Sequence, residues 1–77
     1  MSNRSKVTHA ILVRDCGAPG RRFTRILAKD IAGRSEAERI VSRLASSYER
    51  HGADPGSRMH WFLDGSGRHE LWVRSRA

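Results

Sequence analysis

Basic and aromatic side chains are interspersed over residues 58–74, the stretch RMHWFLDGSGRHELWVR. Arginine guanidinium groups bind phosphates and carboxylates, and aromatic rings stack on nucleic-acid bases. This combination predicts a binding surface for nucleic acid or for an acidic protein surface. The expected binding residues are Arg58, His60, Phe62, Arg68, Trp72 and Arg74, with a second basic group at Arg39, Arg43 and Arg50.

The residue types that most often perform catalysis or bind metal form no recognisable motif in the sequence. Cys16 is the single cysteine, and no sequence feature places a base beside it. His9, His51, His60 and His69 lack the HxH and HxxxH spacings of metal ligands, and the acidic residues show no pairing for acid–base chemistry. We therefore expect a binding protein with no catalytic residue, no metal and no cofactor.

The charge and the length limit the classes of protein that this chain can represent. Its 77 residues include 15 Lys or Arg against 8 Asp or Glu, a formal net charge of +7. Such a charge favours polyanions or acidic proteins, although a GC-rich genome would produce a similar arginine excess without a binding role. We expect one domain, 1–77, with frayed ends at residues 1–6 and 75–77.

No sequence feature predicts contact with a membrane. The longest apolar run is residues 10–13, far below the roughly 18 residues that a spanning helix needs. The polar N-terminus MSNRSKVTHA lacks the apolar region of a signal peptide. We therefore expect a cytoplasmic protein.

Two strands are expected in the first half of the chain. The β-branched run Val7–Val13 is apolar on both faces at its end, which predicts a central strand. The glycine- and proline-containing segment 14–20 predicts a loop. Residues 22–29 are then expected to form the returning strand, with a short helix that stops at Gly33 as the alternative.

The helix over residues 36–51 has the strongest pattern in the sequence. Ser35 and Glu38 have the spacing of a capping box at its start, and Gly52 is expected just past its end. One apolar stripe runs along it: Ala37, Ile40, Val41, Leu44, Ala45 and Tyr48. The basic group of Arg39, Arg43 and Arg50 then faces away from this stripe, either as a binding surface or as a solvated face.

The C-terminal hairpin can turn in two ways, and the choice decides which rings are buried. A two-residue turn, Gly65-Ser66, pairs Trp61 with Glu70. A three-residue turn, 65–67, pairs Trp61 with Leu71 and gathers one apolar face: Met59, Trp61, Leu63, Leu71 and Val73. Because register follows the face that must be buried, we expect the three-residue turn.

In that register Trp61 lies in the core, while Phe62 and Trp72 lie outside as diagonal neighbours. His60 and His69 then lie on opposite faces. The exposed rings can serve a bound ligand. They can also stabilise the sheet across strands or be covered by a dimer partner or by the N-terminal residues.

These elements predict an α+β domain of order ββαββ, with a four-stranded antiparallel sheet and one helix packed on one face. The capped helix SEAERIVSRLASSYERHG followed by the aromatic hairpin HWFLDGSGRHELWV resembles small phage- or plasmid-borne proteins, among them anti-CRISPR proteins. Those proteins share no sequence signature, so no residue role is carried over. Many of them are acidic DNA mimics, and this basic chain departs from that type.

The resemblance implies a non-catalytic inhibitor or adaptor that binds an acidic protein surface of a nucleoprotein complex, or its nucleic acid, and blocks target-DNA binding sterically. The alternative is a module that binds single-stranded nucleic acid directly and without sequence preference, through its arginines and exposed rings. A structural or dimerising module is a third interpretation. We expect a monomer.

Overall fold

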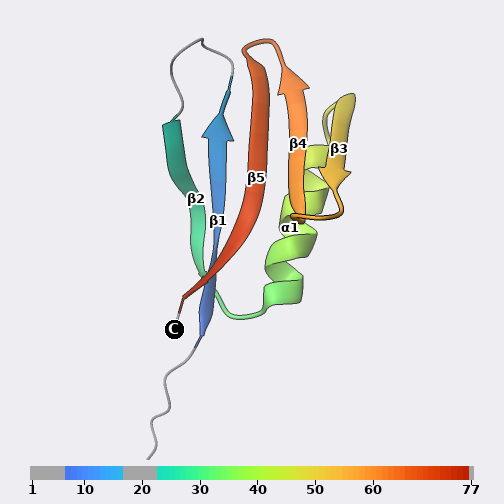
Figure 1. Ribbon diagram of the computed structural model, residues 1–77. Helices are drawn as coiled ribbons and strands as arrows, with labels where there is room; N and C mark the ends of the chain where they lie inside the picture. The colour runs from blue at the N-terminus through green and yellow to red at the C-terminus, as the bar shows by residue number, and fades with distance from the viewer. Residues whose placement is uncertain (1–6, 17–22, 77) are drawn as a thin grey trace, which may run out of the picture.

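The computed structural model describes residues 7–16 and 23–76. Five strands and one helix occur in these residues: β1 (Thr8–Asp15), β2 (Phe23–Ile31), α1 (Arg34–Ser46), β3 (Arg50–Asp54), β4 (Met59–Asp64) and β5 (Gly67–Arg76). The strands form one antiparallel sheet in the order β2-β1-β5-β4-β3 (Figure 1). The α+β class is confirmed, but the sheet has a fifth strand, so the order is ββαβββ.

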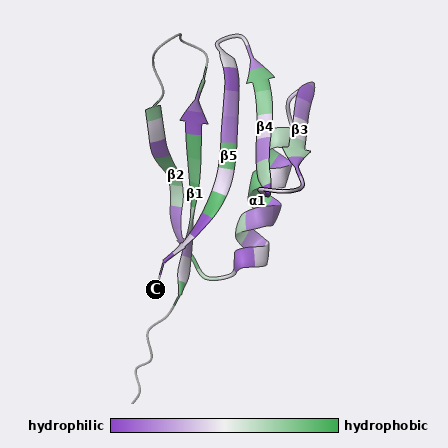
Figure 2. Cartoon of the chain, in the orientation of Figure 1, coloured by the Kyte–Doolittle hydropathy of each residue, from purple (hydrophilic) through white to green (hydrophobic). Residues whose placement is uncertain are grey.

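The predicted strand at Val7–Val13 is confirmed as β1, which runs on to Asp15. It lies between β2 and β5, and its centre is the most hydrophobic part of the sheet (Figure 2). Ile11 and Val13 are 0% and 3% exposed on the side of the helix, and Leu12 is 6% exposed on the opposite side. A strand with neighbours on both sides buries both of its faces, which explains this continuous apolar run.

β2 confirms the returning strand that was predicted at residues 22–29 and excludes the alternative helix. It pairs antiparallel with β1, with irregular register near Ile11. Residues 17–20 of the predicted loop, and Arg22, lie outside the described residues.

α1 covers one face of the sheet, which we call the inner face, and contacts all five strands. It joins β2 at one sheet edge to β3 at the other, and it lies behind β4 in Figure 1. Its buried residues are Ala37, Val41 and Ala45, one helical stripe. We call the opposite face, which no described helix covers, the open face.

Both ends of the predicted helix are corrected. Gly33 is the N-cap and makes no side-chain cap hydrogen bond, so Ser35 lies inside the first turn and the capping box does not form. Glu38 instead binds Arg34 one turn earlier, with Arg34 Nε 3.1 Å from its carboxylate. At the other end, the Ser47 hydroxyl donates to the carbonyl of Leu44 at 2.7 Å, and the helix ends at Ser46.

β3 is the strand that the sequence did not predict. Its residues, RHGAD, include no Val, Ile, Thr, Phe, Tyr or Trp, and they fall where the helical pattern was expected to end. Arg50 therefore lies on β3, apart from Arg39 and Arg43 on α1, and Gly52 pairs with Trp61 instead of ending a helix.

The β4–β5 hairpin has the two-residue turn Gly65-Ser66, so the expected three-residue turn is wrong. Asp64 pairs with Gly67, and the Asp64 carboxylate accepts hydrogen bonds from the amide and the hydroxyl of Ser66, both at 2.8 Å. Gly67 has a φ of 122°, which glycine adopts without a Cβ clash. These local hydrogen bonds stabilise the two-residue turn. The expectation of a three-residue turn rested on the apolar residues of each face, which carry no information about such bonds.

This register exchanges the positions expected for the two neighbouring rings of β4. Phe62 lies in the core at 6% exposure, opposite His69, while Trp61 lies on the open face opposite Glu70. The Phe62 ring stacks between Tyr48 and His69, with centroid distances of 4.0 and 4.9 Å. The smaller ring thus fills the space beneath the end of α1.

β5 is longer at its C-terminal end than the sequence suggested. Ser75 and Arg76, which were expected to be frayed, pair with His9 and Thr8 of β1. Residues 1–6 and 77 lie outside the described part of the chain. The helix in the described residues has 13 residues, and no helix there has the length and hydropathy needed to cross a membrane.

Candidate functional site

One row of paired residues crosses the whole open face. Cross-strand partners share a face, so the register places five side-chain positions in line from β2 to β3. They are Thr24, Arg14, Glu70, Trp61 and Gly52. The row places the carboxylate of Glu70 between the basic Arg14 and the indole of Trp61.

Trp61 lies over Gly52 and next to Arg68. A Cβ atom at position 52 would lie 2.7 Å from the indole, so only glycine leaves room for the ring in this position. The Arg68 guanidinium lies 4.9 Å from the Trp61 ring centroid, a cation–π distance. The indole thus lies against the Gly52 backbone and near Arg68, and it is only partly buried.

Trp72 occupies the neighbouring row of the open face. Its position away from the helix confirms the prediction for this residue. It lies opposite Leu12, which in turn lies opposite Ile26 at the β2 edge. Ile26 is 55% exposed, so this apolar row reaches the solvent. The Arg14 guanidinium lies 5.5 Å from the Trp72 ring centroid.

Glu70 connects the two arginines that contact the tryptophans. Its carboxylate accepts hydrogen bonds from Arg14 Nε at 3.0 Å and from Arg68 Nε at 3.3 Å. Burial alone would raise the pKa of Glu70. The hydrogen bond and charge of Arg14, with smaller contributions from Cys16 and Arg68, lower the pKa by more, so the net shift is downward. The same bond to Glu70 raises the pKa of Arg14. The group of Arg14, Glu70 and Arg68 therefore carries a net charge of +1 at neutral pH.

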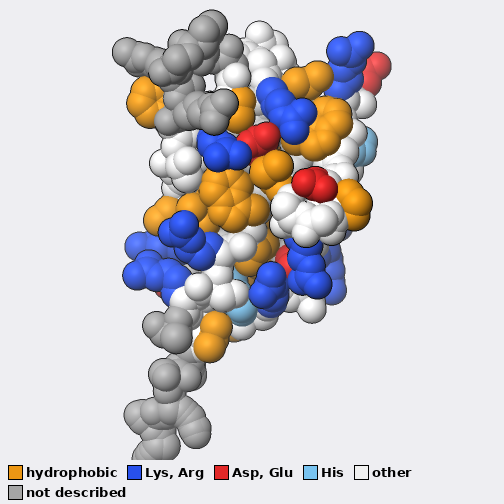
Figure 3. Space-filling view, viewed as in Figure 1, with side chains coloured by type: hydrophobic (Ala, Val, Ile, Leu, Met, Phe, Trp, Pro, Cys, Tyr) orange, Lys and Arg blue, Asp and Glu red, His pale blue; other side chains and the backbone are white. Residues whose placement is uncertain are grey.

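Further arginines surround this group on the open face. Arg74 lies opposite Ala10, and Arg50 lies opposite Leu63, and both arginine side chains are exposed. Figure 3 views the molecule from this side, with hydrophobic side chains across the middle and basic side chains between and around them. The open face thus combines two partly exposed indoles with an excess of positive charge.

The structure brings together some of the sequence-predicted site residues. Arg68, Trp72, Arg74 and Arg50 share the open face. Arg39 and Arg43 are exposed on α1. The remaining predicted residue outside the strands is Arg58, in the turn between β3 and β4.

Two of the predicted site residues are on the wrong side of the sheet. Phe62 is a core residue, and His60 pairs with Leu71 on the inner face. The prediction that His60 and His69 lie on opposite faces is therefore wrong. The same slip of the register hid Trp61, since it was assigned to the core. Arg14 and Glu70 were missed because the two residues are 56 apart in sequence and meet only when β1 pairs with β5.

A second polar cluster, on the inner face, was also missed. His69 is 9% exposed, with Nδ1 2.5 Å from Asp15 and Nε2 3.0 Å from Asp64. Ser66 Oγ lies 3.1 Å from the same Nε2. No sequence spacing indicates this cluster, because it needs β1 and the β4–β5 turn to meet.

Ser66, His69 and Asp15 lie in the order of a Ser-His-Asp triad, but the Ser66 hydroxyl does not donate its proton to the histidine. A serine nucleophile needs the histidine as acceptor of its proton. Here the Ser66 hydroxyl donates to Asp64 at 2.8 Å. The hydroxyl and amide of Ser66, followed by His69, lower the pKa of Asp64 to about 2. We assign the cluster to fixing the turn against β1. Within residues 7–16 and 23–76 no group of His, Cys, Asp and Glu could hold a metal ion.

Comparisons with models of protein families, with curated proteins and with solved structures give no match to this chain. The site therefore has to be interpreted from its own geometry and charge.

Proposed function

We propose that this protein binds single-stranded nucleic acid on its open face. The observation that supports this most is that both tryptophans of the chain lie on that face, each beside an arginine. Trp61 and Trp72 are diagonal neighbours on β4 and β5, with Cα atoms about 7–8 Å apart in such a pairing. One strand can therefore contact both rings. Unpaired bases stack on exposed rings, whereas the bases of a duplex are already stacked within it.

The charge of the open face supports the same ligand. Arg50 and Arg74 are exposed beside the indoles, and the group of Arg14, Glu70 and Arg68 adds a net positive charge. Phosphate contacts of this kind bind without sequence preference and release counterions. The protein then reads neither base identity nor duplex shape, and its affinity depends on salt.

Equilibrium binding tests the stacking part of this proposal. A labelled oligonucleotide of about ten nucleotides, within the range that one small domain covers, is titrated with protein and followed by fluorescence anisotropy. We expect Trp72→Ala to weaken binding by about 1–3 kcal/mol, the contribution of one stacked base. A duplex of the same sequence should bind more weakly. Equal affinity for the duplex, or wild-type affinity of Trp72→Ala, contradicts the proposal.

Two matched pairs of arginine substitutions test the electrostatic part. Arg50 and Arg74 lie on the open face, whereas Arg39 and Arg43 lie on α1, and all four are exposed. Replacing either pair with alanine removes the same charge. The logarithm of affinity should fall with the logarithm of the salt concentration, with a slope of about 0.7 per contacted phosphate. Removing the open-face pair should therefore reduce this slope by about 1.4, and removing the α1 pair should leave it unchanged. Equal effects of the two pairs contradict a site on the open face.

A protein-binding inhibitor is a second candidate, because of the edge strand β2. Ile26 and Leu27 are 55% and 42% exposed on this strand, and exposed apolar edges pair with other chains. An inhibitor of a nucleic-acid-handling complex would bind that complex through β2. Its inhibition would be lost in Ile26→Lys and retained in Trp72→Ala. Loss in Trp72→Ala alone would instead favour direct nucleic-acid binding.

A further inference from the structure

The sheet has a gap beside the C-terminal half of β5. The last β4–β5 pair is His60 with Leu71, while β5 continues to Arg76 along β1. Among the described residues, no strand pairs with β5 on its β4 side beyond Leu71. A pocket of about 290 Å³ occupies this gap. It is lined by Arg14, Arg34, Glu38, Ser57, Arg58, Met59, Trp72 and Val73.

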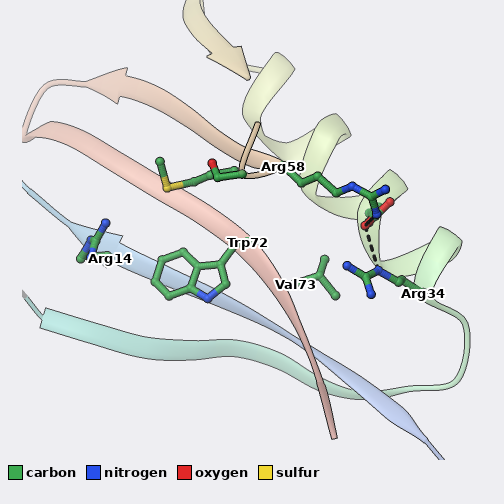
Figure 4. A pocket seen from close by; sticks show the side chains of 8 residues that line it. Arg14, Arg34, Arg58, Trp72 and Val73 are labelled. Carbon is green, nitrogen blue, oxygen red and sulfur yellow. Dashed lines mark hydrogen bonds and ion pairs between the residues drawn. The ribbon is translucent and has the colours of Figure 1, made fainter. Parts of the chain in front are cut away.

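The two sides of this pocket have different chemistry. Trp72 and Arg14 form one side, and Arg34 and Arg58 reach it from the opposite side (Figure 4). Trp72 also belongs to the open face, so the pocket continues from that surface. Arg14 is paired with Glu70, and at the other side Arg34 and Arg58 against Glu38 give a net charge of +1. The pocket thus joins an aromatic wall to a cationic end.

Glu38 holds the two arginines of the cationic end near each other. Its carboxylate lies 3.1 Å from Arg34 Nε and 3.6 Å from Arg58 Nη1. A guanidinium has five N–H donors on three nitrogens, and each of these contacts uses one nitrogen. Glu38 fills the space between these two nitrogens, so an added anion would use the remaining donors of both arginines, on the side away from Glu38.

Arg58 adopts a backbone conformation that is unusual for its residue type. Its φ is 61°, and its amide donates to the carbonyl of Asp54 at 2.8 Å. Glycine takes this conformation readily, whereas a residue with a Cβ takes it at a cost. The turn therefore does not need arginine for its own geometry, and the guanidinium can be removed without disturbing the turn.

We propose that this pocket binds a terminal nucleotide, with its base against Trp72 and its phosphate monoester on the donors of Arg34 and Arg58 that Glu38 does not use. The inference rests on the proposed function, because Trp72 serves both sites. A phosphate monoester carries about −1.5 to −2 charges at pH 7, whereas an internal diester carries one, so paired arginines favour a chain end. The pocket volume is near the lower limit of ligand pockets, which are about 300–1,000 Å³, and suits one nucleotide.

The phosphate monoester can come from the 5′ end of a strand, from its 3′ end or from a free mononucleotide. The experiment therefore compares four probes: one oligothymidylate of about ten nucleotides with a 5′-phosphate, with a 3′-phosphate or with neither, and adenosine monophosphate alone. Binding is measured at equal salt for the wild-type protein. We expect a phosphorylated end to strengthen binding about tenfold, as a charge-assisted hydrogen-bonded contact does.

Two variants locate the effect. Arg58→Gly removes the guanidinium and suits the positive φ, so the fold is retained, as denaturation should show. Arg39→Ala removes the same charge from the exposed surface of α1 and is the matched control. The preference for a phosphorylated end should disappear in Arg58→Gly and persist in Arg39→Ala.

The outcomes separate this inference from the proposed function. Oligonucleotide binding without a preference for a phosphorylated end overturns the pocket and leaves the open face. Binding of the mononucleotide through Arg58 without binding of any oligonucleotide assigns the pocket to free nucleotides and overturns the proposed function. Binding of none of the four probes overturns both.

Discussion

The indole of Trp61 occupies the space above Gly52 where the side chain of any other residue would begin. A Cβ at position 52 would lie 2.7 Å from two atoms of the ring and 2.8 Å from a third. β3 and β4 pair at this point, so the ring is supported by a strand that has no side chain there. The glycine thus determines where one of the two rings of the open face lies.

Gly52→Ala should displace the Trp61 ring and weaken oligonucleotide binding. Forcing extra atoms into a filled space costs about 1–3 kcal/mol, so the free energy of unfolding should also fall. Both effects should vanish in a Trp61→Ala background, because no ring is left to displace. Urea denaturation and anisotropy measure the two quantities. Gly65→Ala is the control, since a Cβ there meets nothing within 4 Å. Additive effects of Gly52→Ala and Trp61→Ala would contradict this relationship.

Phe62→Ala should destabilise the protein far more than Trp61→Ala. Phe62 is 6% exposed and stacks between Tyr48 and His69, and removing a buried aromatic ring costs about 3–5 kcal/mol. Trp61 lies on the open face and is partly exposed. Urea denaturation followed by circular dichroism compares the two variants. If Trp61→Ala unfolds the protein and Phe62→Ala does not, the register of β4 and β5 is wrong.

The sequence patterns predicted elements better than they predicted pairings. The apolar run of β1 and the helical stripe of α1 each follow from the pattern of their own residues, whereas β2 follows from the turn residues before it, since its own apolar residues fall near helical spacing. β3 does not, because its polar residues lie at an edge and are held by β4 instead of by a buried face of their own. The hydrophobic pattern of the sequence therefore does not reveal a polar edge strand such as β3.

The candidate site was predicted only in part for the same reason. Trp72 was placed on the open face correctly, since Leu71 beside it must be buried. The apolar pattern predicts Trp61 in the core, whereas the two-residue turn, with its two hydrogen bonds from Ser66 to Asp64, directs Trp61 to the open face. One residue of slip moves every side chain of a strand to the other face.

Asp64 should contribute to the acid sensitivity of the fold. Its pKa is lowered from an ordinary value of 3.8 to about 2, chiefly by the hydrogen bonds from Ser66 and then by His69. A lowered pKa gives stability that is fully present above the unfolded pKa and is lost as pH falls through the folded one. Stability should therefore decline between about pH 4 and pH 2, and Asp64→Asn should reduce that decline. The urea midpoint at several pH values measures it. An identical acid profile for the variant would show that this carboxylate is not responsible.

If both tryptophans contact the nucleic acid, their fluorescence should report that contact. The chain has two tryptophans, so Trp72→Phe leaves Trp61 as the single reporter, and Trp61→Phe leaves Trp72. Phenylalanine keeps an aromatic ring at each position. Each single-tryptophan protein is titrated with a single-stranded oligonucleotide at about 150 mM salt, a concentration at which exposed charges are strongly screened. The proposal predicts that the oligonucleotide quenches both reporters with the same midpoint. Binding that leaves either emission unchanged, or no binding at all, would contradict it.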